Sequence, residues 1–248
     1  MKPVNVGITG AAGNIGTTLQ EGLARDYSLS LYDTKEILTA PGARFIKTNL
    51  SEETTLHGLF DGLDALIHLA GNPRPDAPRK QTLQNNFLAT SLVFEEARRA
   101  GIKKIVFASS NFYHENDLAQ TLHNPNRGLI TLDAPPSPVC LYGESKVYGE
   151  NLGRHLSYTG GLKFAALRIG WTVPQDTPRP YDSPYMRAVF CSKRDLVQAF
   201  VKALEVDTDF ITAFAVSNNS RAVFDLDETR KTLGFIPQDN AENYFRKD

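Results

Sequence analysis

Tyr142 and Lys146 are the two residues whose types and spacing most clearly suggest chemistry in this chain. A spacing of four residues places both side chains on the same face of a helix. An ammonium group near a phenol favours the phenolate, so it lowers a pKa that starts near ~10. Such a tyrosine can take a proton from a sugar or alcohol hydroxyl near neutral pH. Tyr-x-x-x-Lys also occurs by chance in many helices, so its meaning depends on the elements around it.

The chain opens with a signature for binding a dinucleotide. Residues 4–9 predict a short strand, residues 17–24 predict a helix, and a G-x-x-G-x-x-G turn over residues 10–16 joins them. Glycines let the backbone approach a pyrophosphate, and the helix N-terminus offers free N–H groups and the positive end of its dipole. We therefore expect the pyrophosphate of NAD on this turn.

An acidic residue follows at the place where a ribose would lie. Residues 28–33 predict a second strand that ends in Asp33. Its separation from the glycine turn suits an acid that hydrogen-bonds an adenosine ribose. The negative charge of Asp33 would repel a 2′-phosphate, so the sequence favours NAD over NADP.

Composition limits the class of protein. The 248 residues, 41% of them hydrophobic, allow one large domain with a substantial core. The formal net charge of −1 gives no electrostatic reason to expect a nucleic-acid or membrane partner. Two cysteines make no disulfide scaffold, and the histidines lack metal-ligand spacing, so we expect no metal. The N-terminus has no charged-then-apolar leader and no apolar run reaches ~18 residues, so we expect a cytoplasmic protein.

Strands and helices alternate through the first two-thirds of the chain. We expect strands at 45–48, 65–70, 104–108 and 164–169, and helices at 54–60, 83–100 and 142–156. This order predicts an α/β fold, a Rossmann-like doubly wound parallel sheet with helices on both faces. Ligands of such sheets bind beyond the carboxyl ends of the strands. Gly10, Asp33, Gly71 and Ser110 should therefore converge, whereas His68, inside an apolar strand, should be a packed core histidine.

The composition shifts after Ile169. Residues 174–184 carry four prolines, and we expect a helix at 195–205, a strand at 214–217 and a helix at 226–233. Residues 125–138 are rich in proline and should form a loop before the helix that carries Tyr142. We interpret residues 1–248 as a single domain, with an NAD-binding Rossmann core over 1–169 and mostly a small C-terminal substrate-binding cap over 170–248.

Several short runs resemble one family of enzymes. They are residues 70–75 (AGNPRP), 105–111 (IVFASSN), 141–143 (LYG), 145–146 (SK), 149–152 (GENL), 168–170 (RIG), 233–235 (LGF) and 237–242 (PQDNAE). With these runs the chain resembles the extended short-chain dehydrogenases/reductases, which are NAD-dependent epimerase/dehydratase-like proteins. Within that group it is most similar to small sugar dehydrogenases typified by uronate dehydrogenase and the archaeal-type NAD-dependent glucose-6-phosphate dehydrogenase.

The resemblance implies oxidation of a cyclic sugar, a hexuronate or a hexose 6-phosphate, at C1 to the lactone. It makes Tyr142 the base, while Lys146 lowers the pKa of Tyr142 and holds the nicotinamide ribose. Ser110 matches the hydroxyl that bonds the reacting oxygen, Ser109 is the alternative, and Asn86 matches an asparagine that supports the lysine through water. The residues expected to contact NAD are Gly10, Gly13, Asn14, Ile15, Asp33, Asn49, Leu50, Leu69, Ala70, Gly71, Asn86, Tyr142, Lys146 and Ile169. The residues expected to contact the sugar are Asn72, Arg74, Ser109, Ser110, Asn111, Tyr142, Arg187 and Arg194.

The chain departs from the family pattern where an acidic sugar would be held. Phe112 stands where uronate dehydrogenases have a histidine, and Tyr185 stands where alignment without gaps puts their carboxylate-binding arginine. Trp171 replaces a small residue. A carboxylate or phosphate could instead meet Arg74, Arg187 or Arg194, because a guanidinium suits such oxyanions.

Two other functions use the same fold. An epimerase or dehydratase acting on a nucleotide-sugar would keep its NAD tightly bound, but the stretch after Gly170 leaves little room for a nucleotide and no acid follows Ser109 and Ser110. A non-catalytic NAD sensor would be favoured by loss of Tyr142 or Lys146, and both are present. In this family the helices expected at 83–100 and 142–156 commonly form a dimer interface, so we expect a homodimer or higher oligomer.

Overall fold

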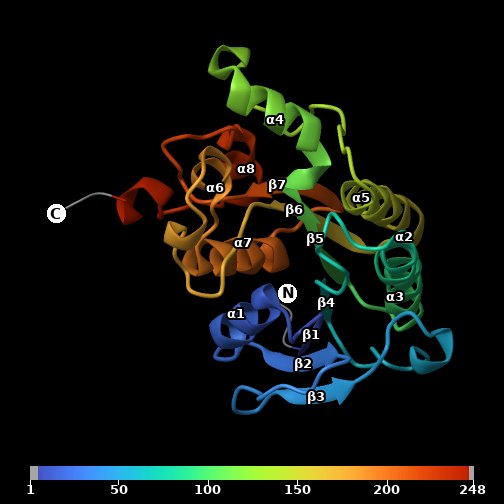
Figure 1. Cartoon of the computed structure of the whole chain (residues 1–248). Coiled ribbons are helices and arrows are strands. Elements are labelled where there is room, and N and C mark those ends of the chain that lie inside the picture. Colours follow the sequence, from blue (N-terminus) through green and yellow to red (C-terminus); the bar gives the residue numbers. More distant parts are fainter. Residues whose placement is uncertain (1–4, 246–248) are drawn as a thin grey trace.

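The computed structural model describes residues 5–245, so Val4, expected at the start of the first strand, lies outside the described residues. Seven strands form one sheet in the order β3-β2-β1-β4-β5-β6-β7, and every neighbouring pair is parallel (Figure 1). The strands are β1 (Asn5–Thr9), β2 (Ser28–Asp33), β3 (Arg44–Lys47), β4 (Ala65–His68), β5 (Lys104–Ser110), β6 (Lys163–Ile169) and β7 (Phe210–Ala215). The predicted Rossmann-like parallel sheet is confirmed.

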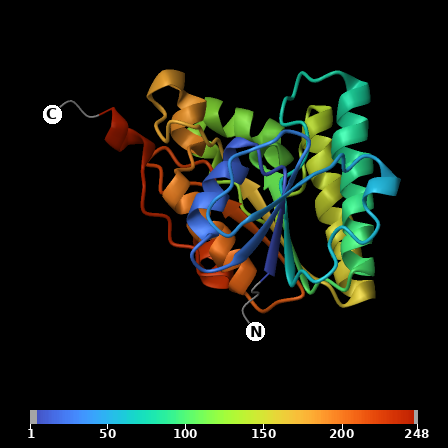
Figure 2. The ribbon, with the colours of Figure 1, turned by 90° about the horizontal axis from the view of Figure 1, so that it is seen from below.

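Helices cover both faces of the sheet (Figure 2). On one face α1 (Asn14–Leu23) and α7 (Lys193–Glu205) share a core with the strands through residues such as Leu19 and Phe200. On the other face α3 (Ala89–Arg99) and α5 (Leu141–Gly160) do the same through Phe94 and Leu156. Because both faces are covered, the central strands are buried along their length, which explains their continuous apolar runs.

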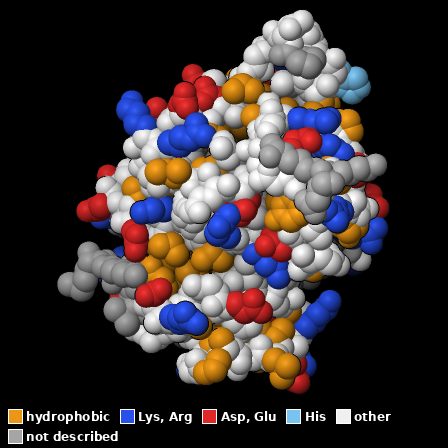
Figure 3. Space-filling view, turned by 90° about the vertical axis from the view of Figure 1, so that its left-hand side faces the viewer, with side chains coloured by type: hydrophobic (Ala, Val, Ile, Leu, Met, Phe, Trp, Pro, Cys, Tyr) orange, Lys and Arg blue, Asp and Glu red, His pale blue; other side chains and the backbone are white. Residues whose placement is uncertain are grey.

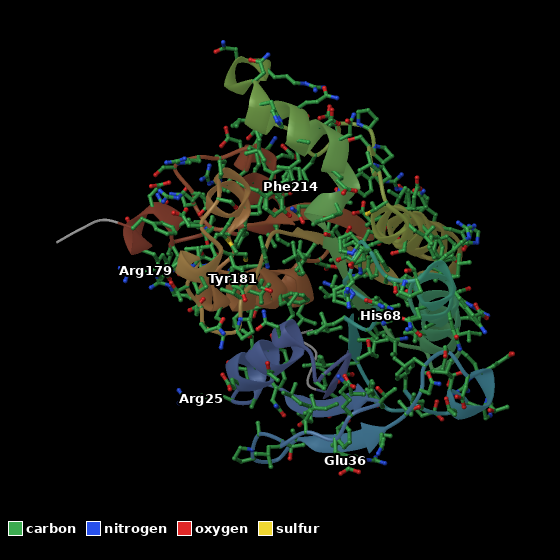
Figure 4. All side chains as sticks on the ribbon, in the orientation of Figure 1. Arg25, Glu36, His68, Arg179, Tyr181 and Phe214 are labelled. Atoms are coloured by element: carbon green, nitrogen blue, oxygen red, sulfur yellow. The ribbon has the colours of Figure 1, made fainter. Side chains whose placement is uncertain are left out.

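His68 shows how a polar side chain is accommodated in this core (Figure 4). Its Nδ1 lies 2.8 Å from Thr9 Oγ1 and its Nε2 lies 3.1 Å from Thr90 Oγ1. Burial lowers the pKa of His68 to about 3, so the ring is neutral at physiological pH. The expected core histidine is confirmed.

Three predicted elements differ from the structure. Residues 54–60 do not form a helix. Only a 3-10 turn is present, at Glu53–Thr55, and Gly58 then adopts a φ of +74°, which is incompatible with a continuing helix. The helix expected at 83–100 begins earlier, as α2 (Arg79–Thr82), and passes through a π-helical turn, η2 (Leu83–Leu88), into α3. The late strand lies at β7, four residues before its expected start. A helix within the connection after β5, α4 (Glu115–His123), was not predicted.

Part of the segment 170–248, which we expected to be mostly a cap, belongs to the sheet and its covering helices. Residues after 169 include β7, which pairs with β6, and α7, which packs on the sheet. The remaining helices α6 (Pro184–Val189) and α8 (Asp227–Leu233) lie with α4 in the upper part of Figure 1. A separate apolar cluster containing Leu118, Val189, Phe214 and Phe224 packs this region together. The proposal of a substrate-binding cap therefore applies to the segments outside α7 and β7.

The surface mixes charges. Figure 3 shows Lys and Arg side chains interspersed with Asp and Glu side chains over one face. Among the described residues, no helix is both long enough and apolar enough to cross a membrane.

The packing of α5 on the sheet generates a stability prediction. A Cβ on Gly153 would lie 2.2 Å from Cζ of the buried Phe164 ring, so Gly153→Ala should lower the free energy of unfolding by about 1–3 kcal/mol. Gly160→Ala, on the same helix, is the control, because its Cβ would lie 3.7 Å from Arg98 Cδ, an ordinary contact. Denaturant unfolding measures both. Equal stability of the two variants would contradict the close packing of α5.

Candidate active site

A cleft of about 970 Å³ runs along the carboxyl edge of the sheet, a volume near the upper end for ligand pockets. Gly10, Asp33, Gly71 and Ser110 all line it, so the convergence predicted from the sequence is confirmed. Strands β1 and β4 are neighbours in the sheet, but the chain continues from β1 to β2 on one side and from β4 to β5 on the other. A doubly wound fold forms a ligand-binding crevice at such a switch in strand order.

The glycine turn forms the pyrophosphate end of the cleft. Gly10 adopts a φ of +70°, and a Cβ there would lie 2.8 Å from Ala70 N, so only glycine lets β1 and β4 approach at this point. Helix α1 starts at Asn14, with Gly13 at its N-cap and no side-chain cap, so its N-terminal N–H groups remain available to an anion. Asn14 Nδ2 donates to Thr172 Oγ1 at 2.9 Å and so links the turn to the segment after β6. These features fit a dinucleotide.

Asp33 lies beside the glycine turn at the end of β2. Its carboxylate accepts hydrogen bonds from Ala12 N at 2.9 Å and from Lys35 N at 3.0 Å. Asp33 therefore stabilises the turn and also lines the cleft where an adenosine ribose would lie. All but one of the remaining residues predicted to bind the cofactor line the cleft. Those that do so are Gly13, Asn14, Ile15, Asn49, Leu50, Leu69, Ala70, Tyr142, Lys146 and Ile169.

Asn86 is the exception, because it lies behind the cleft wall. Its side chain accepts a hydrogen bond from Asn72 N at 2.8 Å and donates to Asn72 O at 3.0 Å and Ser145 Oγ at 3.2 Å. Asn86 therefore ties the loop after β4 to α5. It belongs to the π-helical turn η2, a distortion that is frequent at functional sites.

The three residues proposed for catalysis, Ser110, Tyr142 and Lys146, line the same cleft. Lys146 and Tyr142 occupy one face of the first turns of α5, and the Lys146 ammonium lies 5.4 Å from the centre of the Tyr142 ring. Lys146 Nζ donates to Ala108 O at 2.8 Å, and Ser110, at the end of β5, hydrogen-bonds the Tyr142 phenol. Cys140 caps α5, with Sγ accepting from Gly143 N at 3.4 Å, so the helix begins directly before Tyr142.

The electrostatics of this trio differ from the expectation. Burial raises the pKa of Tyr142 above 10.0, and the hydrogen bond with Ser110 offsets this only in part. Burial also lowers the pKa of Lys146 to about 8, although the nearby carboxylate of Glu150 opposes that change. The predicted lowering of the Tyr142 pKa by Lys146 is therefore absent in this structure, because loss of solvation dominates both groups.

The sugar residues predicted from the sequence fall into two groups. Asn72, Arg74, Ser110, Asn111 and Tyr142 line the cleft. Ser109 also borders it, but its hydroxyl donates to Glu150 Oε1 at 2.6 Å.

Arg187 and Arg194 lie outside the cleft lining. Arg187 pairs with Asp182 at 2.6 Å and with Glu242 at 3.0 Å. Arg194 pairs with Asp239 at 2.5 Å. The structure therefore places these two arginines in ion pairs with acids of the C-terminal region and not in the cleft lining.

The sequence reasoning did not assign several aromatic and polar residues to the site. Phe112, Trp171, Thr172 and Tyr185 line the cleft, and Asn111 Nδ2 donates to Tyr185 Oη at 2.6 Å. Trp171 and Thr172 directly follow the carboxyl end of β6, and that position was the available signal. Within the described chain, no group of three or more His, Cys, Asp or Glu side chains is placed to hold a metal ion.

Comparison with known proteins agrees with this geometry. Residues 6–180 match the NAD dependent epimerase/dehydratase family, and the chain belongs to that family. It is 31% identical over 249 residues to an NAD-dependent glucose-6-phosphate dehydrogenase of Haloferax volcanii, with 96% of this chain and 94% of the relative covered. It is 32% identical to an L-arabinose 1-dehydrogenase (NAD(P)(+)) of the same organism, with 95% and 97% covered.

A solved structure shares both fold and cofactor class. A mutant uronate dehydrogenase of Agrobacterium tumefaciens complexed with NAD has a TM-score of 0.84 and 28% identity, with 98% of this chain and 88% of that chain covered. The predicted family, the class of NAD-dependent sugar dehydrogenases and the NAD cofactor are confirmed at the level of these relatives.

The position of Asp33 predicts the cofactor preference. Asp33→Asn removes the charge that would repel a 2′-phosphate but keeps an oxygen that can accept from Ala12 N. We expect the ratio of kcat/KM for NAD to that for NADP to fall about tenfold, which corresponds to ~1.4 kcal/mol. Asp26→Asn, an exposed acid just after α1, is the control and should leave the ratio unchanged. An unchanged ratio in Asp33→Asn would remove Asp33 from cofactor selection.

Proposed function

We propose that this protein oxidises a cyclic sugar at C1 to the lactone and reduces NAD. The observation that supports the proposal best is the arrangement of Ser110, Tyr142 and Lys146 in the same cleft as the glycine turn and Asp33. A dinucleotide held by the turn and by Asp33 would extend along the strand ends toward Tyr142. The relatives that are named sugar dehydrogenases support the same reaction class.

The residues proposed to bind NAD contribute by holding the cofactor in a fixed position. The N–H groups at the start of α1 would hold the pyrophosphate, Asp33 would accept from the adenosine ribose, and Lys146 would donate to the nicotinamide ribose. When bound, NAD supplies the acceptor for the hydride that leaves C1. Holding the sugar C1–H in line with that acceptor converts a bimolecular reaction into an effectively unimolecular one.

The proton leaves through Tyr142. The Tyr142 phenolate takes the proton of the C1 hydroxyl, and Ser110 donates a hydrogen bond to the same oxygen. In the free protein burial outweighs the effect of Lys146, so the phenolate of Tyr142 is the minor form near neutral pH. The products are the lactone and NADH, so the protein must release the reduced cofactor after each turnover.

An epimerase or dehydratase would use the same Tyr142 and Lys146 but would regenerate NAD internally. We regard it as the second candidate because the family description covers both activities. Residues 193–205 and 210–215 form α7 and β7, so they belong to the layers of the sheet and do not form a separate nucleotide-binding segment. Net accumulation of NADH would support the dehydrogenase.

The expected homodimer stays a proposal. Helices α3 and α5 lie side by side on the outside of the sheet (Figure 2). Leu88, which directly precedes α3, exposes 47% of its surface and is available to a second copy.

Tyr142→Phe tests the proposed base. Loss of the phenol oxygen should lower kcat at least ~100-fold, because general acid–base catalysis contributes that much or more. Affinity for NAD, measured by calorimetry, should remain within about threefold because the ring itself remains. Tyr158→Phe, an exposed tyrosine on the same helix, is the control. Full activity of Tyr142→Phe would remove Tyr142 as the base.

The pKa shifts predict how the reaction depends on pH. Because burial raises the pKa of Tyr142 above 10.0, the phenolate fraction of the free protein increases with pH through neutrality. We expect kcat/KM to rise ~tenfold per pH unit and to level off near pH 8, where Lys146, with a pKa of about 8, begins to lose its charge. A profile that is flat from acid to pH 8 would contradict these protonation states.

A further inference from the structure

The end of the cleft beyond Tyr142 is lined by aromatic rings. Phe112 packs edge-on against Tyr142 with ring centres 5.5 Å apart, and Trp171 lies 5.7 Å from Tyr185. Outside the lining, Tyr181 packs on Trp171 at 5.3 Å and supports it from the next turn of chain (Figure 4). Rings in such an arrangement offer broad apolar faces to a ligand.

The polar groups between these rings are uncharged. Asn111 bridges Ser110 and Tyr185, because its Oδ1 accepts from Ser110 Oγ at 3.2 Å and its Nδ2 donates to Tyr185 Oη at 2.6 Å. Burial raises the pKa of Tyr185 to about 12, so its hydroxyl stays neutral at physiological pH. The site therefore presents hydroxyl and amide groups that match the hydroxyls of a sugar.

The basic side chains that line the cleft have partners other than the aromatic end of the cleft. Within residues 5–245 the basic residues that line it are Lys35, Arg74 and Lys146. Lys35 follows Asp33 at the ribose end, and Lys146 donates to Ala108 O. Arg74 lies on the exposed rim and forms a bidentate pair with Asp76, at 3.1 and 2.9 Å. Lys146 lies 5.4 Å from the centre of the Tyr142 ring, but its ammonium donates to Ala108 O and points to the side of the site where the nicotinamide ribose would lie.

We propose, on the basis of the proposed function, that the sugar oxidised here is an uncharged aldose and that Tyr185 determines this preference. A carboxylate or phosphate placed among these rings would lose its water without gaining a cationic partner. An uncharged sugar packs its C–H face on the rings and directs its hydroxyls to Asn111, Ser110 and Tyr185. This substrate class differs from the hexuronate or hexose 6-phosphate that the family resemblance implied.

The single tryptophan of the chain provides a direct test of binding, because Trp171 lines the cleft. Tyr142→Phe loaded with NAD would be titrated with glucose against glucuronate, galactose against galacturonate, glucose 6-phosphate, and the pentoses arabinose and xylose, while Trp fluorescence is recorded. We expect the tightest ligand to be neutral and to bind at least ~tenfold more tightly than any anion. An anion that binds as tightly as the best neutral sugar, or no fluorescence change with any sugar, would overturn the inference.

A matched pair of variants tests the role of Tyr185. Tyr185→Arg adds a guanidinium inside the cleft and should raise the affinity ratio of glucuronate to glucose at least ~tenfold. Tyr181→Arg adds the same charge outside the cleft lining, on a side chain that is 42% exposed, and should leave the ratio unchanged. Equal ratios in both variants would remove Tyr185 as the determinant.

Turnover of the unmodified protein separates this inference from the proposed function. If neutral sugars bind preferentially and NADH still fails to appear with any of them, the proposed oxidation is wrong and the binding preference stands. If NADH forms fastest with glucuronate or glucose 6-phosphate, the oxidation stands and the preference for an uncharged sugar is wrong.

Discussion

The buried ion pair between Glu150 and Arg168 anchors α5, the helix that carries Tyr142 and Lys146. Glu150 lies on the same face of α5 as Tyr142 and Lys146, and its carboxylate meets the Arg168 guanidinium of β6 at 2.9 Å with both side chains almost fully buried. Removing one partner of such a pair typically costs about 3–5 kcal/mol. Ser109 adds a third contact, so one carboxylate connects α5, β5 and β6. The spacing between Tyr142 and Ser110 therefore depends on two charged residues that lie outside the cleft lining.

A second constraint acts from the opposite side of the site. Asn86 uses both ends of its amide to hold the Asn72 backbone and reaches Ser145 on α5 with the same nitrogen. Its burial means that these hydrogen bonds form without competition from water. Asn86 thus links the loop after β4 to α5, and it lies within the π-helical turn η2.

Local patterns carried the predictions that succeeded. The glycine turn, Asp33 and the Tyr142–Lys146 spacing each depend on a few consecutive residues, and parallel pairing then brings strand ends together. The failures have local and distant causes. Residues 54–60 lack a helix for a local reason, because Gly58 adopts a φ of +74°. The pKa of Tyr142 follows burial rather than its spacing from Lys146. Asn111 and Tyr185 form one hydrogen-bonded pair although 74 positions separate them in sequence.

The arginines show why a substrate charge is difficult to read from sequence. Arg187 resembles an anion-binding residue by its proximity to the aligned position, yet Asp182 and Glu242 already neutralise it. Arg168, in a run shared with the family, is committed to Glu150. An arginine binds a substrate anion only if no carboxylate of the protein reaches it first, and that competition is decided by tertiary contacts. In this chain Asp182, Glu242 and Asp239 pair with Arg187 and Arg194, and the cleft lining around Tyr185 consists of aromatic rings and neutral hydrogen-bonding groups.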